Sequence, residues 1–445
     1  MSKIQPIAAI DIGTTKIVAI VGTLDDKGKV NVLGFGEAPS KGVIRGSVQN
    51  VGEVSAAIKE AAKKCQEYAG VTFKSVFVGI AGQNIRTNET SHSRFVSSQI
   101  MTQADIDELT NEVYNLNREA DEEVIHVIPQ YYMVDNNRIG LSPVGCSGKK
   151  LTGSFKVVVG RANAVQKIRQ AINMSGLSIA KIVLQSVASA DAVLSNDDKE
   201  VGTLVADIGA GTTDVAIYHD KVLRDIAVIP FGGNAITNDI KTATLLTARQ
   251  AETLKLQYAA AFPDSKAEKT IVTIKSAGRT DKEISLSDLV AVTNARAEEI
   301  VAGIAHILQK SGYDDRVTQI SITGGGSRLK NLTTLINYHL DNRSVNVVKP
   351  RNFTTDSCPK LNSVEYSTAI GLLVKGFEYI TKLMAAKANE PQQPQAEQQG
   401  KPQSVDSKPD TKSDKKPAAK KRTFLSWFND TVKNFFSDDA EASKL

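Results

Sequence analysis

Two short segments each place a carboxylate, a glycine and threonine hydroxyls at the end of an apolar strand. The first, DIGTTK, spans residues 11–16, and the second, DIGAGTTD, spans residues 207–214. A glycine-containing turn offers successive backbone N–H groups to an anion, hydroxyls add donors, and a carboxylate can hold the water shell of Mg²⁺. One copy alone is equally typical of a polar hairpin tip. The repeat predicts two related halves whose loops face each other around a phosphate chain.

A third segment, SITGGGSRL at residues 321–329, joins an apolar strand to three glycines. Such a turn lets the backbone approach a flat ligand such as an adenine ring, and a following helix N-terminus favours phosphate. Taken alone, the glycine cluster is more typical of a simple strand-to-helix turn.

The segments between these loops alternate apolar strands with amphipathic helices, which favours an α/β fold. The expected strands are Ile7–Ile10, Ile17–Val21, Val76–Ile80, Val124–Ile128, Val157–Val159, Leu204–Ala206, Val215–Tyr218 and Ile320–Ile322. The expected helices include Val51–Ala69, Ala164–Met174, Ala248–Ala261, Ser287–Lys310 and Ser367–Leu383. Thr102 and Asp105 form a capping-box pattern that predicts a further helix start.

Composition narrows the class of protein. The chain has 445 residues, 41% of them hydrophobic, and no apolar run long enough to span a membrane, so we expect a cytoplasmic protein. Cys65, Cys146 and Cys358 are too widely spaced for a metal site, and we expect reduced core residues. The net charge of +5 is matched by the five basic residues of one cluster, 415–422, which argues against general nucleic-acid binding.

In this order, the three loops resemble the two phosphate motifs and the adenosine motif of the actin, heat-shock chaperone and sugar kinase superfamily. Within that superfamily the chain resembles the bacterial cell-division FtsA family over about residues 4–386 and in its last stretch. The segments that carry the resemblance are IHVIPQYYMVDNNRIGLSPVGCSGKKL (125–151), PFGGNAITNDI (230–240), ARAEEI (295–300) and YSTAIGLLVKG (366–376).

The resemblance implies ATP and Mg²⁺ as ligands. The residues that match the nucleotide-binding motifs are Asp11, Gly13, Thr14, Thr15 and Lys16, then Asp207, Gly209, Gly211, Thr212, Thr213 and Asp214, then Gly324, Gly325, Gly326 and Ser327. Asp11 and Asp207 would hold Mg²⁺ through water. Glu252 and Lys255 match positions that contact ribose and adenine, although their i, i+3 spacing is equally typical of a solvated ion pair on a helix.

One departure from the superfamily concerns hydrolysis. Efficient members tend to place a Glu or Gln before the second phosphate loop, where it acts on the attacking water. Here the segment carries Gln185, whose neutral amide can orient a water molecule but cannot take its proton. We therefore expect tight nucleotide binding with slow hydrolysis, and no catalytic residue.

The resemblance also implies an actin-like two-lobed fold of duplicated ribonuclease-H-like halves with a family-specific inserted subdomain. The expected divisions are 1–82 with 162–197 and 364–386 (1A), 83–161 (1C), 198–231 with 298–363 (2A), and 232–297 (2B). On the resemblance alone, 2B would bind the C-terminal peptide of the cell-division tubulin FtsZ. The protein would also form filaments and contact other division proteins.

The C-terminal part has a different composition. Residues 387–422 are rich in Pro, Gln and Lys and are expected to form a disordered linker. In residues 423–438 the apolar side chains fall on one half of a helix, next to the basic cluster, which predicts binding to an anionic membrane surface. These side chains are Phe424, Leu425, Trp427, Phe428, Val432, Phe435 and Phe436. The alternative is a helix that docks on the chain itself or on a partner.

The sequence therefore favours an ATP-binding, polymerising adaptor at the cytoplasmic face of the division septum, with weak hydrolysis at most. The alternative from another class is a phosphotransferase such as a sugar kinase, which needs a base for a substrate hydroxyl and has no use for a lipid-seeking tail. A chaperone-type ATPase would need a peptide-binding domain after residue 386, and the remaining residues are too few for one.

Overall fold

The computed structural model describes residues 5–388, except 27, 83–84, 117–118, 264–269, 276–280, 342, 352 and 355–357. The helix predicted at 423–438, and all but the first two residues of the predicted linker, lie outside the described residues. The chain divides into two units, Met1–Phe377 and Glu378–Leu445. The elements below belong to the first unit, apart from the C-terminal part of helix α10 (Ser367–Ala388).

The first sheet has six strands in the order β11-β6-β1-β2-β3-β19. Strand β1 pairs antiparallel with β2 and parallel with β6, β2 pairs antiparallel with β3, and β6 pairs parallel with β11. The bounds are β1 Ile7–Ile12, β2 Lys16–Leu24, β3 Val30–Pro39, β6 Ser75–Ile80, β11 Ser178–Leu184 and β19 Phe353–Thr354.

The second sheet repeats this pattern in five strands, in the order β14-β13-β12-β17-β18. Strand β12 pairs antiparallel with β13 and parallel with β17, β13 pairs antiparallel with β14, and β17 pairs parallel with β18. The bounds are β12 Thr203–Ile208, β13 Thr213–His219, β14 Val222–Ile229, β17 Gln319–Thr323 and β18 Ser344–Val347. The shared order and directions confirm the predicted duplication of the two halves.

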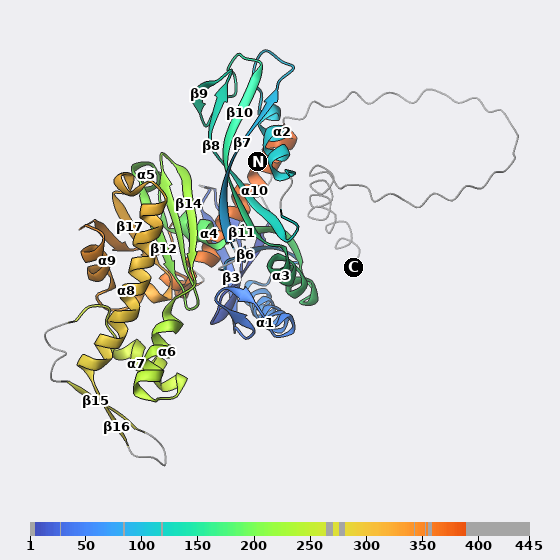
Figure 1. Ribbon diagram of the computed structural model, residues 1–445. Coiled ribbons are helices and arrows are strands. Elements are labelled where there is room, and N and C mark those ends of the chain that lie inside the picture. Colours follow the sequence, from blue (N-terminus) through green and yellow to red (C-terminus); the bar gives the residue numbers. More distant parts are fainter. Residues whose placement is uncertain are drawn as a thin grey trace, which may run out of the picture. The chain divides into compact units, whose positions relative to one another are not determined.

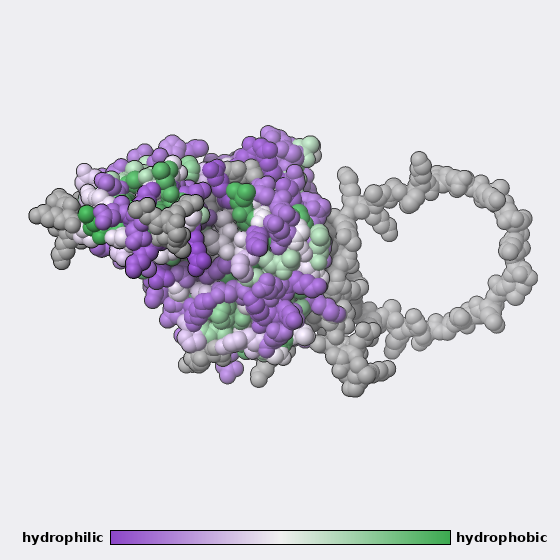
Figure 2. All heavy atoms as spheres, turned by 90° about the horizontal axis from the view of Figure 1, so that it is seen from below, coloured by the Kyte–Doolittle hydropathy of each residue, from purple (hydrophilic) through white to green (hydrophobic). Residues whose placement is uncertain are grey.

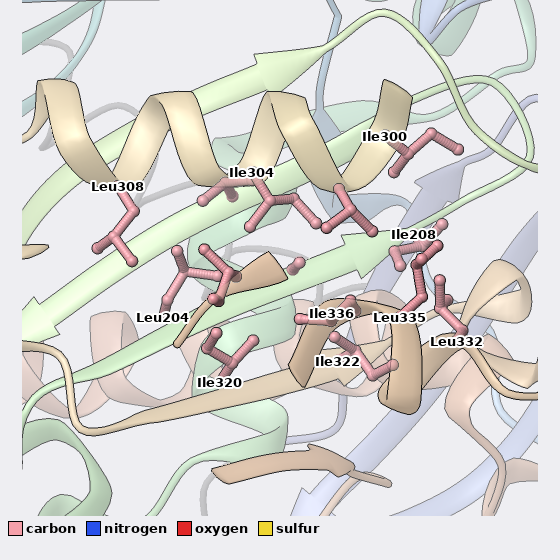
Figure 3. Close-up of a cluster of buried hydrophobic side chains, with 14 of the residues drawn as sticks. Leu204, Ile208, Ile300, Ile304, Leu308, Ile320, Ile322, Leu332, Leu335 and Ile336 are labelled. Carbon is pink, nitrogen blue, oxygen red and sulfur yellow. The ribbon is translucent and has the colours of Figure 1, made fainter. Parts of the chain in front are cut away.

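Helices α8 (Leu286–Lys310) and α9 (Leu332–His339) cover the second sheet and close its core. Figure 3 shows Ile304 and Leu308 of α8 on the side of the helix that faces the strand residues Leu204 and Ile320, with Ile300 nearer to Ile208. Ile304, Leu308, Leu204 and Ile320 are fully buried. Each such side chain contributes about 1.5–3 kcal/mol to folding, so this core fixes the strand ends that carry the second loop.

The first half is packed by α1 (Val51–Ala69), which lies against β2 and β3. Asn50 caps its first turn by accepting from the Glu53 N–H, and Gly70 ends it in the left-handed conformation, with φ of 65°. A Cβ on Gly36 of β3 would lie 2.2 Å from the Ala61 carbonyl oxygen, so the helix approaches as closely as it does because that residue is glycine. The further elements here are α3 (Ala162–Met174), α4 (Gln185–Val193), α5 (Asn196–Val201), β4 (Val43–Ile44) and β5 (Ser47–Val48).

A four-stranded antiparallel sheet is inserted between β6 and α3, in the order β7-β10-β8-β9 (Figure 1). Helix α2 packs on it, and the predicted capping box of Thr102 and Asp105 is present at the start of this helix. Leu109 of α2 and Phe155 of the sheet share one core. The bounds are β7 Ile85–Phe95, α2 Gln103–Tyr114, β8 Glu122–Val134, β9 Asn137–Gly140 and β10 Lys150–Arg161.

A second insertion follows β14. It contains α6 (Gly233–Thr244), α7 (Ala248–Tyr258) and the hairpin β15–β16 (Ile271–Ile274 and Lys282–Ser285), and its apolar side chains form a separate core around Ile240. Helix α7 ends three residues earlier than predicted, because Ala259 is extended and Ala260 forms a bridge with Lys330.

The predicted strands are confirmed, most of them longer in the structure than in the sequence pattern. The expectation of three buried cysteines is wrong for Cys146, which is partly exposed, whereas Cys65 and Cys358 are buried. The face in Figure 2 is mainly hydrophilic, with apolar side chains in separate groups. No helix in the described part of the chain is long and apolar enough to span a membrane.

Candidate functional site

The first loop is the tight turn between β1 and β2. The Gly13 N–H donates to the Lys16 carbonyl oxygen at 3.1 Å, and Thr14 and Thr15 lie at the tip of the turn. A Cβ on Gly13 would lie 2.6 Å from that same oxygen. The closed turn therefore requires glycine and leaves the backbone and hydroxyls of the tip open to a ligand.

The second loop has the same closure, with the Gly209 N–H donating to the Thr212 carbonyl oxygen at 2.9 Å. The two threonine pairs are not equivalent, because Thr14 and Thr15 lie within their turn whereas Thr213 begins β13. Thr213 is fully buried and donates its hydroxyl proton to the Phe231 carbonyl oxygen at 2.9 Å. In the matching turns, Gly13 corresponds to Gly209 and Lys16 corresponds to Thr212.

The two loops touch each other. A Cβ on Gly211 would lie 2.4 Å from the Thr14 hydroxyl oxygen and 3.1 Å from the Arg45 Cα. Only glycine fits between the loops at this position. The structure thus brings the two predicted phosphate loops together, although Thr14 and Gly211 are 197 residues apart in the chain.

Three carboxylates gather beside the loops. Burial and the charge of Asp207 raise the pKa of Asp11 to about 7, against the opposing charge of Lys16. Burial and the same neighbour raise the pKa of Asp214 to about 7, and burial raises the pKa of Asp207 itself. Burial and mutual repulsion thus disfavour the ionised carboxylates, and a cation bound beside them would relieve both effects.

The carboxylates suit a hydrated cation better than a directly ligated one. Among the described residues, no group of three or more His, Cys, Asp or Glu side chains forms a candidate metal centre. Mg²⁺ usually keeps several of its waters and uses one or two carboxylates. Asp11 and Asp207 fit this role, as the sequence predicts.

Two polar side chains from neighbouring helices hold the aspartates. Gln185, the first residue of α4, donates from Nε2 to Asp11 Oδ1 at 2.9 Å. Thr368, in the first turn of α10, donates from its hydroxyl to Asp207 Oδ2 at 2.9 Å. The sequence points to Gln185 but not to Thr368, whose only signal is its place at the start of a helix.

Lys16 is held by an aromatic ring and a carboxylate. Its ammonium lies 3.6 Å from the centroid of the Tyr366 ring and 3.9 Å from Glu37. Burial lowers the pKa of Lys16, whereas the charge of Glu37 opposes that shift. The Tyr366 hydroxyl donates to Glu37 at 3.0 Å. The ammonium at the end of the first loop is thus held by Tyr366 and Glu37, and the sequence gives no sign of the ring.

The glycine cluster after β17 packs directly against the second loop. Gly324 has φ of 80°, and a Cβ there would lie 2.3 Å from Asp207 Oδ1. Ser327 is buried and donates its hydroxyl to the Gly324 carbonyl oxygen at 2.7 Å. The cluster therefore shapes the second loop, with Gly325 and Gly326 in a 3₁₀ turn that also contains Ser327.

Glu252 and Lys255 of α7 are more than a solvated pair. Lys255 Nζ contacts Glu252 at 2.8 Å and also donates to the Gly233 carbonyl oxygen of α6 at 3.1 Å. The N–H groups of Gly233 and Asn234 in turn donate to carbonyl oxygens of the second loop, at 2.9 and 2.8 Å. The pair is thus connected to the phosphate loop through the start of α6.

Two matching halves with facing glycine loops define an actin-like α/β fold. The structure is similar to the solved PilM-PilN type IV pilus biogenesis complex, with a TM-score of 0.59 at 16% identity, over 83% of this chain and 98% of that one. That similarity concerns the fold alone.

Sequence comparison is more specific. The family model "Cell division protein FtsA" matches residues 204–371, and "SHS2 domain inserted in FTSA" matches residues 82–159. The FtsA of Pseudomonas aeruginosa is 34% identical over 84% of this chain and 89% of its own length. The FtsA of Neisseria meningitidis serogroup B is 33% identical over 82% of this chain and 89% of its own length. The chain belongs to the FtsA family of cell division proteins, as the resemblance predicts.

Proposed function

We propose that the chain binds ATP with Mg²⁺ between its two glycine loops. The observation that carries this proposal is the contact of the loops at Thr14 and Gly211, beside aspartates whose pKa is raised by burial. Asp11 and Asp207 would hold the magnesium waters, and Lys16 would neutralise phosphate charge. When bound, Mg²⁺ supplies positive charge that offsets the phosphates and the aspartates. The glycine cluster and the Glu252–Lys255 pair would bind the adenosine.

Hydrolysis should be slow. Gln185 donates its amide hydrogen to Asp11, which leaves its carbonyl oxygen to orient a water molecule, and an amide cannot accept the proton as a base does. We therefore propose that the protein uses nucleotide binding, and not rapid hydrolysis, to set its own conformational state. In a phosphate-release assay with ATP and Mg²⁺ but no partner, we expect turnover well below one per second. Steady release of several phosphates per second would contradict this proposal.

At the level of the cell, we propose a filament-forming adaptor that ties the FtsZ ring to the cytoplasmic membrane at the septum. Membership of a cell division family supports the setting. The amphipathic pattern at 423–438 and the basic cluster before it support the membrane contact. On the resemblance alone, we also propose that 232–297 binds the FtsZ peptide.

Calorimetry on the full chain tests the nucleotide site. Asp207→Ala removes an anchor of the magnesium waters, and we expect the affinity for ATP with Mg²⁺ to fall about tenfold or more. The far-ultraviolet circular dichroism should stay unchanged, because the core of the second sheet does not depend on this side chain. Asp26→Ala, on an exposed turn, is the matched control. Equal affinity of the Asp207 variant and the native chain would rule out this site.

A further inference from the structure

The hairpin turn between β4 and β5 has an unusual residue in a left-handed conformation. Arg45 and Gly46 form the two-residue turn, and their φ angles are 48° and 71°. Turns with two positive φ values favour Asn, Asp and Gly, because a longer side chain crowds the backbone there. The turn between β8 and β9 follows that preference, with Asp135 and Asn136 at φ of 47° and 69°. An arginine in this place is strained.

This turn touches both glycine loops. The Gly46 N–H donates to the Thr14 hydroxyl of the first loop at 3.4 Å. The Arg45 Cα lies 3.1 Å from the position of a Cβ on Gly211 of the second loop. The strained residue therefore sits where the two loops meet, in a segment that the sequence motifs do not include.

The charge of Arg45 is not balanced by an acid. Two guanidinium groups lie near the ring of Phe231, with the Arg296 Cζ at 5.4 Å and the Arg45 Cζ at 6.0 Å from its centroid. Arg296 pairs with Asp239 and Glu299. Arg45 is exposed and, within the described part of the chain, makes no ion pair with a carboxylate. Of the two cations on this ring, only Arg45 is free to meet an anion.

We propose that Arg45 binds the terminal phosphate of the nucleotide held between the loops, an inference that rests on the proposed function. The guanidinium presents paired N–H donors that match phosphate oxygens, and the Phe231 ring supports its plane. Strained backbone persists where the surrounding structure enforces it, and it concentrates at ligand sites. Arg45 thereby distinguishes ATP from ADP, and it carries that difference to Phe231, which follows β14 (Val222–Ile229).

Arg45→Gly separates this role from a structural one. Glycine relieves the strain at φ of 48°, so the variant should unfold at a higher temperature than the native chain. Its affinity for ATP with Mg²⁺, measured by calorimetry on the full chain, should fall about 10- to 100-fold, the range of a charge-assisted hydrogen bond. Its affinity for ADP with Mg²⁺ should change less than about twofold, because ADP lacks the third phosphate. Arg45→Lys keeps the charge without the paired donors, so its affinity for ATP should lie between that of the native chain and that of Arg45→Gly.

Asn136→Gly is the matched control, since it relieves a positive φ in the β8–β9 turn. It should raise the unfolding temperature without changing either affinity. Equal loss of ATP and ADP affinity in Arg45→Gly, or no loss of either, would overturn the role of Arg45 while leaving the nucleotide site in place. If the native chain bound neither nucleotide, the proposed function would fail, and this inference would fail with it.

Discussion

At the scale of single residues, the three aspartates of the site destabilise the folded protein when no ligand is bound to it. Asp11 and Asp214 titrate near 7 because they are buried and because Asp207 lies close to both. An acid whose pKa is raised on folding binds its proton more tightly in the folded state. Near neutral pH, the folded chain therefore either keeps protons on this cluster or bears unfavourable negative charge. The proposed site for a cation and a phosphate chain would account for such a cluster.

The pH dependence of stability follows from the direction of these shifts. With no nucleotide and with a chelator present, Asp214 contributes most to the free energy of unfolding below pH 3.8, which is the pKa of this carboxyl in the unfolded chain. It is lost as the pH rises toward 7, at up to about 1.4 kcal/mol per pH unit. We expect Asp214→Asn, which keeps an acceptor for the Thr212 hydroxyl, to be about 1–3 kcal/mol more stable than the native chain at pH 8.

That advantage should shrink at pH 5, where the native carboxyl already carries a proton. Urea unfolding at the two pH values measures both differences. Asp26→Asn, on an exposed turn, should show no advantage at either pH. A destabilised Asp214→Asn at pH 8 would mean that the ionised carboxylate has a favourable partner within the chain.

The sequence identifies the loop residues of this site and, of their supporting partners, only Gln185. Asp11, Asp207 and the glycines lie in short motifs, so local spacing is enough to find them. Thr368 is 161 residues from Asp207, and Tyr366 meets Lys16 only through the folding of the first half. Arg45 carries no motif, and its left-handed φ becomes visible only in the structure. Such contacts depend on tertiary packing, which composition and periodicity do not encode.

At the scale of elements, the inserted sheet covers the free edge of the second sheet. Strand β14 is an edge strand, and two of its carbonyl oxygens accept hydrogen bonds from side chains of the insert. Gln130 donates to the Leu223 carbonyl oxygen at 2.9 Å, and Thr87 donates to that of Ile226 at 3.3 Å. An unprotected edge invites pairing with other chains, so the insert shields this one.

A partly buried ion pair holds the same contact. Lys156 of β10 lies 3.2 Å from Asp225 of β14, with 12% and 19% of their side chains exposed. Removing one partner leaves the other charge poorly solvated. In a double-mutant cycle of Lys156→Met and Asp225→Asn, we expect a coupling energy of about 1–2 kcal/mol by urea unfolding.

The exposed pair Lys63 and Glu67 on α1, at 3.7 Å, provides the control for this cycle. Its coupling should stay below about 0.5 kcal/mol, as is usual for solvated pairs on helices. Hydrogen exchange in β14 should also quicken in Lys156→Met. A coupling energy no larger than that of the control would show that the insert does not depend on this pair.

The bounds of a helix or strand are predicted well where a single hydrophobic periodicity runs through the whole segment. Helix α1 has the predicted bounds, because an apolar stripe, an Asn cap and a terminal Gly agree. Strand β8 has 13 residues, whereas the pattern predicts only its apolar part, Val124–Ile128. Its remainder contains Pro129, Gln130 and Tyr131, which do not alternate, and its pairing with β10 is irregular near Pro129. The strand order of the sheets follows from pairing between distant segments, which no local pattern reveals.

At the scale of the whole molecule, the two proposed contacts fall in separate parts of the sequence. The described residues contain the two glycine loops and no helix that could span a membrane. The predicted membrane contact lies at residues 423–438, outside the described residues, and its case rests on the apolar stripe and the basic cluster in the sequence. A single interfacial helix is a weak anchor. Filaments would bring many tails to one surface, so avidity would rise without any new contact.

Trp427→Glu tests the tail independently of the nucleotide site. Trp427, Phe428 and Phe435 should together contribute a few kcal/mol, because a fully buried apolar side chain gives about 1.5–3 kcal/mol and an interfacial one less. A glutamate on this stripe opposes insertion and is repelled by anionic lipid. We expect the variant to stay in the supernatant when liposomes that contain anionic lipid are sedimented, with its ATP affinity unchanged.

Asn429→Glu, on the polar half of the same predicted helix, adds the same charge and serves as the control for repulsion alone. It should bind less strongly than the native chain but far better than Trp427→Glu. Raised salt should weaken the native chain, because the basic cluster at 415–422 acts through screened charge. If Trp427→Glu sedimented as fully as the native chain, the apolar stripe would not be what holds the protein to lipid. The segment would then be a helix that docks on a protein partner.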